Sequence, residues 1–514
     1  MLQSTFINDT SGSVQLLTCM TMSCRQPISI MFGYILASLF LSCMVPGGWA
    51  TPLDDYVNRP DPTYSYEIIE TLQGEGYTLY NINMTSQTWK PDLQSQPVWW
   101  HYLSVTVPDK ILIKGAGFML IDGGSNHDGP PKPTENFVRL TSVVAATTGT
   151  IGACLKQVPN EPITFHADPQ KKNRNEDAII AWTWKTFVDQ NGSDPEILLR
   201  MPMTKAGVRG MDTVNDITQK KLGVTTDRFL VAGASKRGWT TWTVGAVDKR
   251  VIAIAPMVMD LLDMQNNLHH YYRSLGGWTF AFDDYYALNF TKELDSPYIK
   301  AMAAIIDPLS YNDRYANKPK YITSTGGDEF FMVDDSKYYY NIIKGDTYLR
   351  MVPNAEHSLA GHETSVMFAI RAFYLQVINN KPLPKMNWVL NTTSTGGKIS
   401  LTTDVQPLTV DVYHATTLDG KRKDFRLLRG TPGDPSKPQP HPVLWKRTYA
   451  TPSSALSWEV EFTNPPTGWT AFFIQATFQG IDGAVLEMTT QTLVIPDTYP
   501  FPDCHGDDCR GTLV

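Results

Sequence analysis

The chain has 514 residues, 42% of them apolar, and a formal net charge of −7 at pH 7. This apolar content is enough for a large core and excludes a disordered chain. Because the sequence contains no long basic run, we do not expect nucleic acid as a partner. The length predicts two or three domains.

The N-terminal segment has the features of a secretory signal. Residues 28–45 are apolar and uncharged, Arg25 precedes them, and the small residues Gly48 and Ala50 follow. This order is typical of a signal peptide with its cleavage site. We therefore predict that residues 1–50 are a signal peptide or upstream extension, and that the mature protein is secreted without a stable membrane span. An uncleaved anchor is the alternative, because the apolar stretch is borderline in length for spanning a bilayer.

Between about residues 95 and 380, segments with strand and helix patterns alternate. The expected strands are 98–107, 117–121, 150–158, 227–232, 251–257, 320–324 and 347–352. The expected helices are 136–146, 176–188, one within 198–221, 239–247 and 364–377. Such alternation predicts an α/β domain over residues 51–381, with a mostly parallel sheet covered by helices on both faces.

Residues 260–294 interrupt this alternation with a segment rich in aromatic side chains, Trp278 among them. An insertion at this point of an α/β sheet would lie over the strand ends as a lid. The alternative is ordinary packing of aromatic side chains between helices.

After residue 384 the pattern changes to short strands separated by turn clusters. The expected strands are 388–390, 398–401, 410–415, 443–448, 457–462, 471–478 and 485–494. Short strands at this spacing predict an all-β sandwich over 385–498, followed by a tail over 499–514.

Two further patterns agree with secretion. Cys504 and Cys509 in the tail are close enough in sequence to close a small disulfide loop. N-glycosylation motifs begin at Asn83, Asn191, Asn289 and Asn391. The motifs HExxH, P-loop and complete GxGxxG are absent from the sequence, and we predict no metal and no cofactor.

The candidate nucleophile is Ser235, in Gly233-Ala234-Ser235-Lys236-Arg237-Gly238. A serine between glycines, after an apolar strand and before a helix, is the layout of a nucleophile elbow, in which the helix N-terminus faces the reacting carbonyl. The usual pattern is G-x-S-x-G. Here Arg237 occupies the position of the second glycine, and Gly238 follows one residue later.

A serine nucleophile needs a base and an acid that orients it, and in this architecture both follow the serine in loops after later strands. Asp328 follows the strand 320–324, and His357 follows the strand 347–352. We predict Asp328 as the acid and His357 as the base. The rival acids are Asp260, Glu329, Asp334 and Asp335, and the rival base is His362, which we expect at the final helix.

Two backbone N–H groups would form the oxyanion hole. We predict one at Lys236 and the other in the glycine loop, at Gly124 or Ser125, although that loop can also be a simple turn. Arg237 can pair with an acid or bind an anionic substrate group. Weaker substrate-binding candidates are Arg237, Glu176 and Trp278, and a free amino terminus can be bound by Glu161, Glu176 or Asp177.

Several segments together resemble the PhoPQ-activated pathogenicity-related family. The matching segments are residues 53–57, 123–126, 175–182, 233–240, 327–330 and 354–358. The resemblance implies an α/β-hydrolase-like fold, a C-terminal β-sandwich and secretion. The family includes a secreted repressor of proliferation, so two functions follow. One is a secreted serine hydrolase that cleaves a small-molecule ester or a peptide; the other is a secreted signalling or binding protein with a cell-surface receptor and no essential catalysis.

Overall fold

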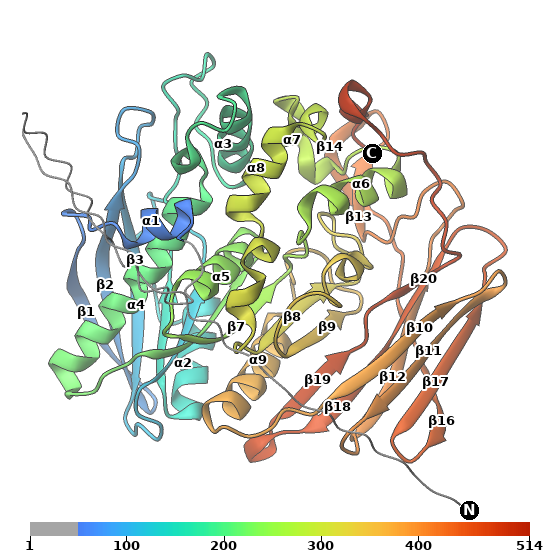
Figure 1. Ribbon diagram of the computed structural model, residues 1–514. Helices are drawn as coiled ribbons and strands as arrows, with labels where there is room; N and C mark the ends of the chain where they lie inside the picture. Colours follow the sequence, from blue (N-terminus) through green and yellow to red (C-terminus); the bar gives the residue numbers. More distant parts are fainter. Residues whose placement is uncertain (1–49) are drawn as a thin grey trace, which may run out of the picture. The chain divides into compact units, whose positions relative to one another are not determined.

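The apolar segments expected as strands form the parallel part of a large sheet in the computed structural model, which describes residues 50–514 (Figure 1). The rest of the predicted signal segment, residues 1–49, lies outside the described residues. These parallel strands are β4 (Ala116–Ile121), β5 (Ile151–Leu155), β6 (Arg228–Ala234), β7 (Val251–Met257), β8 (Lys320–Thr325) and β9 (Thr347–Val352). β4 is buried along its whole length, as expected for a parallel strand covered on both faces.

Antiparallel strands continue the sheet beyond both of its parallel edges. On one side are β1 (Ser65–Gly74), β2 (Tyr77–Thr88) and β3 (Val98–Pro108). On the other are β12 (Thr409–Thr416), β15 (Lys446–Tyr449), β18 (Thr470–Gln479), β19 (Val485–Thr489) and β20 (Leu493–Ile495). The complete order is β1-β2-β3-β5-β4-β6-β7-β8-β9-β19-β18-β12-β15, with β20 beside β18, which makes 14 strands.

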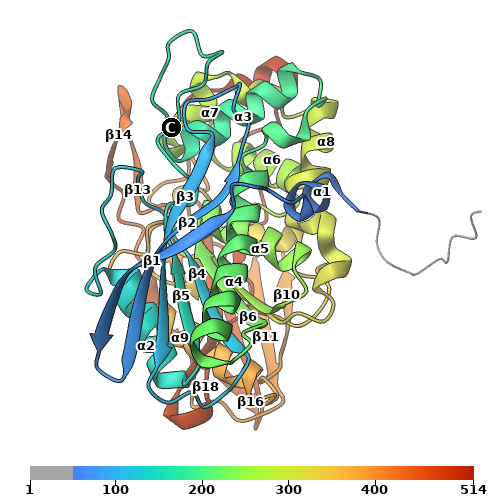
Figure 2. The ribbon, with the colours of Figure 1, turned by 90° about the vertical axis from the view of Figure 1, so that its left-hand side faces the viewer.

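Helices cover both faces of the parallel part (Figure 2). On one face, α2 (Asn136–Thr148) and α9 (Glu363–Ile378) pack through side chains such as Val144 and Phe373. On the other, α4 (Arg200–Leu222) and α5 (Lys236–Val247) pack through side chains such as Met211 and Trp242. The remaining helices are α1 (Pro52–Asn58), α3 (Asp177–Asp189), α6 (Met264–Leu275), α7 (Asp283–Ala287) and α8 (Pro297–Ile306).

A four-stranded sheet packs against the C-terminal strands of the large sheet. It contains β10 (Met386–Thr392), β11 (Gly396–Thr403), β16 (Thr451–Ser454) and β17 (Ser457–Thr463), in the order β10-β11-β17-β16. Ile399 of β11 and Ile474 of β18 belong to one buried apolar cluster. β13 (Leu428–Thr431) and β14 (Asp434–Pro440) form a separate hairpin.

The predicted α/β-hydrolase-like fold with additional C-terminal β-sheets is therefore confirmed. The C-terminal strands are joined to the parallel part through β19, in which Thr489 pairs with Leu349 of β9. Residues 50–514 accordingly form one compact unit, in which the large sheet contains both the parallel strands and strands of the C-terminal part. Within these residues, no helix is long and apolar enough to cross a membrane.

The structure differs from the expected elements mainly at the edges of the sheets. β1, β2, β13, β14 and β16 were not predicted, and the expected strand 485–494 divides into β19 and β20. β1 carries polar side chains on a largely exposed ribbon, so its sequence lacks the apolar run that identifies a buried strand.

Candidate active site

Ser235 occupies a strained turn between β6 and α5. Its φ of 57° and ψ of −128° lie outside the regions that residues other than glycine favour, at a cost of about 1–3 kcal/mol. The Ser235 N–H donates to the Met257 carbonyl at 2.9 Å, which attaches the turn to β7. A Cβ at Gly233 would lie 2.6 Å from the Arg237 carbonyl oxygen, so only glycine fits there. These features define the predicted nucleophile elbow.

The structure brings the three predicted triad side chains into one hydrogen-bonded chain. The Ser235 Oγ lies 2.8 Å from the His357 Nε2, and the His357 Nδ1 lies 2.9 Å and 3.1 Å from the two Asp328 carboxylate oxygens. A proton on Nδ1 satisfies the carboxylate and leaves Nε2 to accept the hydrogen bond from the serine hydroxyl. The arrangement can therefore remove the hydroxyl proton of Ser235.

Asp328 is held as a hydrogen-bond acceptor by its own loop. It accepts hydrogen bonds from the Phe330 and Phe331 N–H groups at 2.8 and 3.2 Å and from the Thr325 hydroxyl at 3.0 Å. Burial lowers the pKa of His357, but the charge of Asp328 and its hydrogen bond outweigh burial, so the pKa of His357 is raised above its ordinary value of 6.5. Phe330 also packs on the imidazole, with ring centres 4.4 Å apart.

The rival residues have other contacts. The Asp260 carboxylate accepts from the Ser324 hydroxyl at 3.1 Å, and Glu329 accepts from the His357 backbone N–H at 2.8 Å. His362 is the residue just before α9, and its side chain makes no capping hydrogen bond. Asp334 pairs with His270 at 2.9 Å, and Asp335 accepts from the Met332 N–H at 2.7 Å.

The displaced glycine of the elbow has a steric explanation. A Cβ at Gly238 would lie 2.8 Å from the Met257 carbonyl oxygen, so the close approach of α5 to β7 falls at this position. The Arg237 side chain instead turns toward the loop after β4. A Cβ at Gly123 would lie 2.6 Å from the Arg237 Nη2, so Gly123 makes room for the guanidinium.

Arg237 and Lys236 pair with acidic groups at the start of α3. The Arg237 guanidinium donates to both Glu176 oxygens at 2.8 and 2.5 Å, and its Nε donates to the Val158 carbonyl at 2.6 Å. The Lys236 Nζ lies 2.7 Å from Glu176 and 2.9 Å from Asp177. Burial raises the pKa of Glu176, but the two cations outweigh it and hold that pKa below its ordinary value. Arg237 therefore pairs with an acid, and Glu176 contacts both cations. Their predicted roles in substrate binding stay predictions.

Ser235 lines two cavities. The first, of about 50 Å³, lies beneath the aromatic segment 260–294 and is also lined by Lys236, Asp177 and the predicted Trp278. The second, of about 250 Å³, is also lined by Lys236, Arg237 and His357. The two ends of a substrate bound at Ser235 can therefore extend in two directions.

The predicted oxyanion role of Lys236 stays a prediction, and its place in the helix is compatible with it. Lys236 is the first residue of α5, where backbone N–H groups have no partner within the helix. The Ser125 N–H instead donates to the Asp128 carboxylate at 2.7 Å, and neither Gly124 nor Ser125 is among the residues that line the two cavities. The roles of Gly124 and Ser125 stay predictions that this geometry does not favour.

Trp445, which precedes β15, connects the loops of the acid and the base and was not found from sequence. Its Nε1 donates to the Gly326 carbonyl at 2.8 Å, in the loop of Asp328. Its backbone N–H and carbonyl bond the Asn354 side chain at 2.7 and 3.0 Å, in the loop of His357. The signal is purely spatial, since no sequence pattern links residue 445 to either loop.

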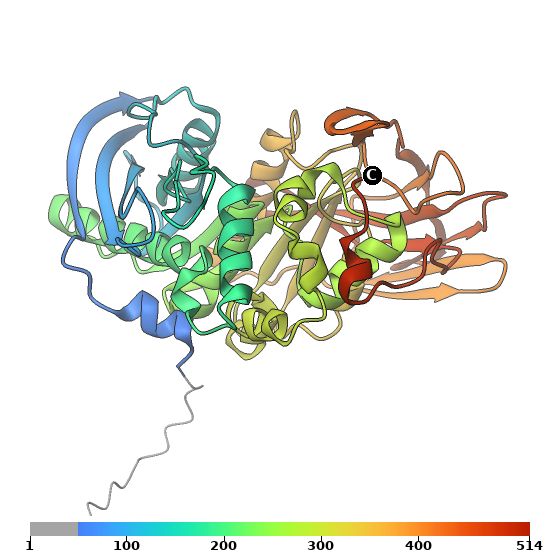
Figure 3. The same cartoon turned by 90° about the horizontal axis from the view of Figure 1, so that it is seen from above.

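The C-terminal tail packs against the aromatic segment (Figure 3). The predicted disulfide between Cys504 and Cys509 is present. The Trp278 indole donates to the Cys509 carbonyl at 2.9 Å, and the Trp278 N–H donates to the Thr512 carbonyl at 2.8 Å. The tail therefore fixes one side chain of the first cavity.

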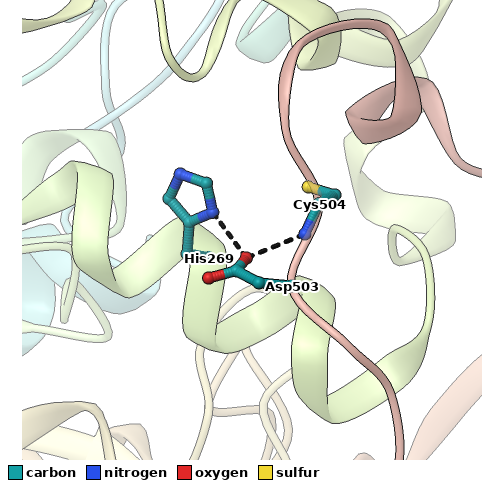
Figure 4. Close-up of side chains that lie close together, drawn as sticks. All are labelled: His269, Asp503 and Cys504. Atoms are coloured by element: carbon teal, nitrogen blue, oxygen red, sulfur yellow. Dashed lines mark hydrogen bonds and ion pairs between the residues drawn. The ribbon is translucent and has the colours of Figure 1, made fainter.

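A second contact between the tail and α6 involves His269 and Asp503, whose side chains lie 2.8 Å apart (Figure 4). The Cys504 N–H donates to the same carboxylate oxygen at 2.9 Å. Although His269, Asp503 and Cys504 lie together, the Cys504 sulfur is bonded to Cys509 and is not available to a metal.

The four predicted glycosylation motifs differ in exposure. Asn191, Asn289 and Asn391 are exposed, whereas Asn83 is half-buried within β2. The first three asparagines are accordingly accessible on the folded protein.

Comparison with known proteins identifies a protein family that this chain matches. The profile of the family described as PhoPQ-activated pathogenicity-related protein matches residues 53–426. The autocrine proliferation repressor protein A of Dictyostelium discoideum is 37% identical over 490 residues, which cover 92% of this chain and 97% of that protein.

Solved structures with a similar fold include two acetyl xylan esterases. One, from a Thermoanaerobacterium species, has 16% identity and a TM-score of 0.40, covering 61% of this chain and 93% of its own. The other, from a Paenibacillus species, has 13% identity and a TM-score of 0.43, covering 62% and 92%.

Proposed function

We propose that this chain, which belongs to the PhoPQ-activated pathogenicity-related protein family, is a secreted serine hydrolase that cleaves an ester or peptide bond. The observation that carries the proposal is the hydrogen-bonded chain from Ser235 through His357 to Asp328, which reaches two cavities. A strained serine at a helix N-terminus adds support, because backbone strain of this kind is concentrated at active sites and Ser235 lines both cavities.

In the proposed reaction, the Ser235 Oγ attacks the substrate carbonyl carbon while His357 takes the hydroxyl proton at Nε2. The negative charge that forms on the carbonyl oxygen is stabilised by the Lys236 N–H. His357 then gives its proton to the leaving oxygen or nitrogen, and the bond from that atom to the carbonyl carbon breaks. The same imidazole then takes a proton from a water molecule, whose oxygen attacks the acyl carbon. The bond from that carbon to the Ser235 Oγ breaks, and His357 returns the proton to Ser235.

A fluorophosphonate probe tests the proposal, because it reacts covalently with an activated serine. We expect it to label the wild-type protein at Ser235, and Ser235→Ala to abolish both labelling and ester hydrolysis. Ser310→Ala is the matched control, since Ser310 is exposed and its hydroxyl donates to the Ala303 carbonyl of the preceding helix α8, away from Ser235. Absence of labelling at Ser235, under conditions that label a known serine hydrolase, would refute the proposed chemistry.

A second candidate function is signalling, favoured by the 37% identity to a protein named as a proliferation repressor. In this case a cell-surface receptor would bind the protein and hydrolysis would be dispensable. Ser235→Ala separates the two functions. If the purified variant still represses proliferation of responsive cells at the wild-type dose, signalling does not need hydrolysis. If repression is lost while receptor binding is kept, signalling does need hydrolysis.

We propose secretion and glycosylation on the signal pattern of residues 1–50, the disulfide, and the exposed Asn191, Asn289 and Asn391. Expression in a eukaryotic host should release a protein into the medium whose mature N-terminus lies near residue 51. Its mass should fall after enzymatic removal of N-glycans. Retention in the cell membrane would instead support an uncleaved anchor.

A further inference from the structure

The two cavities at Ser235 differ in chemical character. The first is walled by aromatic and aliphatic side chains, among them Trp184, Trp239, Trp278, Phe282, Phe290 and Leu268. The second also contains apolar groups, but it carries the charged or polar side chains of Asp122, Arg237, His357 and Ser358. Ser235 and Lys236 line both, so a substrate carbonyl at Ser235 lies where the two cavities meet.

The position of His357 distinguishes the two ends of a substrate. After the attack, the Nε2 proton must reach the leaving oxygen or nitrogen, so the leaving group lies next to the imidazole. His357 lines the second cavity and is not among the residues that line the first. The leaving group therefore occupies the second cavity, and the acyl group extends into the first.

The polar groups of the first cavity are already paired. Asp177 accepts from the Tyr285 hydroxyl at 3.0 Å and lies 2.9 Å from the Lys236 Nζ. Thr291 donates to the Arg510 carbonyl at 3.4 Å. A sugar or charged acyl group would lose its hydrogen bonds to water, and these side chains, which already have partners, would not replace them. An apolar group has no such hydrogen bonds to lose.

The cavity wall is held in place before a substrate binds. Trp278 is anchored by two tail carbonyls and packs against Phe282 and Tyr271, with ring centres 5.9 and 6.2 Å apart. A preformed apolar cavity binds an apolar group without first ordering its wall, which lowers the entropic cost of binding.

We propose that the first cavity is an acyl-binding site for an apolar acyl group larger than acetyl, either a medium aliphatic chain or an aryl group, and that a polar leaving group occupies the second cavity. This inference rests on the proposed hydrolase function. In the reaction, the acyl carbon bonds to the Ser235 Oγ on the side of the first cavity. The leaving group departs through the second with the proton that His357 took from Ser235, and water enters there to release the carboxylic acid.

Esters with one leaving group and different acyl chains test the proposal. We expect kcat/KM for p-nitrophenyl esters to rise at least tenfold from acetate to hexanoate, since each buried methylene contributes about 0.8 kcal/mol, or roughly fourfold. Leu268→Trp fills the cavity and should lower kcat/KM at least tenfold for hexanoate and benzoate, and about twofold or less for acetate. The matched control is Leu408→Trp, since Leu408 is exposed and lies outside both cavities.

A binding measurement separates failure of this inference from failure of the hydrolase function. Three tryptophans line the cavity, so ethyl hexanoate should change the intrinsic fluorescence of the folded Ser235→Ala protein, and ethyl acetate should not at equal concentration. Leu261→Phe is a milder filling variant if Leu268→Trp does not fold.

If Ser235 is labelled and esters are cleaved with no dependence on chain length, the acyl site is wrong and the hydrolase stands. If Ser235 is inert and ethyl hexanoate still binds, the hydrolase is wrong and the apolar site stands. Absence of both binding and chain-length dependence overturns the acyl site.

Discussion

Gly123→Ala tests whether the absence of a side chain at Gly123 is needed to make room for the Arg237 guanidinium. The added methyl would lie 2.6 Å from the Arg237 Nη2 and 2.9 Å from its Cζ, so the guanidinium must move. Overpacking of this kind costs about 1–3 kcal/mol. The stiffer unfolded chain returns about 0.4–1 kcal/mol, since Gly123 has no positive φ to forbid alanine. We therefore expect a net loss of about 1–2 kcal/mol in the free energy of unfolding.

Chemical denaturation of the purified variant measures this loss. Gly129→Ala is the matched control, because Gly129 lies in the same loop, has no positive φ and would place its methyl in open space. We expect that control to be neutral or slightly stabilising. If Arg237 causes the loss, Gly123→Ala should cost much less in an Arg237→Ala background, and the double-mutant cycle should give a coupling of at least about 1 kcal/mol. Equal effects of Gly123→Ala in both backgrounds would refute the steric explanation.

Three further predictions concern the site and its surroundings. Asp328→Asn should lower kcat by about 10³–10⁴. In the wild type, kcat/KM should rise with pH through a pKa above 6.5, because His357 must be neutral to accept a proton. Removing the Asp328 charge should move this inflection to lower pH. A pH–rate profile of both proteins checks the shift. Burial and the neighbouring Glu176 raise the pKa of Glu161 to about 8, so the folded protein holds a proton that the unfolded chain releases, and stability should fall as pH rises from about 4.5 to 8. Glu161→Gln should flatten that slope in denaturation curves, and an unchanged slope would contradict the assignment. Replacing Cys504 and Cys509 by serine removes a loop closure of about 2 kcal/mol, so proteolysis of residues 499–514 and amide exchange around Trp278 should accelerate; unchanged exchange would mean that the tail does not fix the cavity wall.

The sequence revealed the parts of the fold whose local chemistry is distinctive. The buried parallel strands are continuous apolar runs, and Ser235, Asp328 and His357 each follow such a run, so their convergence follows from the parallel arrangement. β1 and β2 were missed because their side chains are largely polar or of mixed burial, and no apolar run marks them.

Other parts of the site depend on contacts between distant residues. The sequence motif indicated a displaced glycine, but only the carbonyl of Met257 explains why the glycine stands at 238. The sequence did not indicate that Gly123 makes room for the Arg237 guanidinium, because that contact joins two distant segments. Trp445 lies far beyond His357 in the sequence, and no local pattern relates the two residues.

The shared sheet limits how the functions of this protein can be dissected. β9, which leads to His357, is covered on its outer edge by β19, and both the acid and base loops bond Trp445. A chain cut near residue 385 would leave the backbone groups of β9 unpaired at a sheet edge, where they invite aggregation. A shortened protein that lost activity would therefore not reveal whether the C-terminal half binds a receptor. Surface substitutions on the four-stranded sheet, which leave β9 and its loops intact, are the sounder way to ask that question.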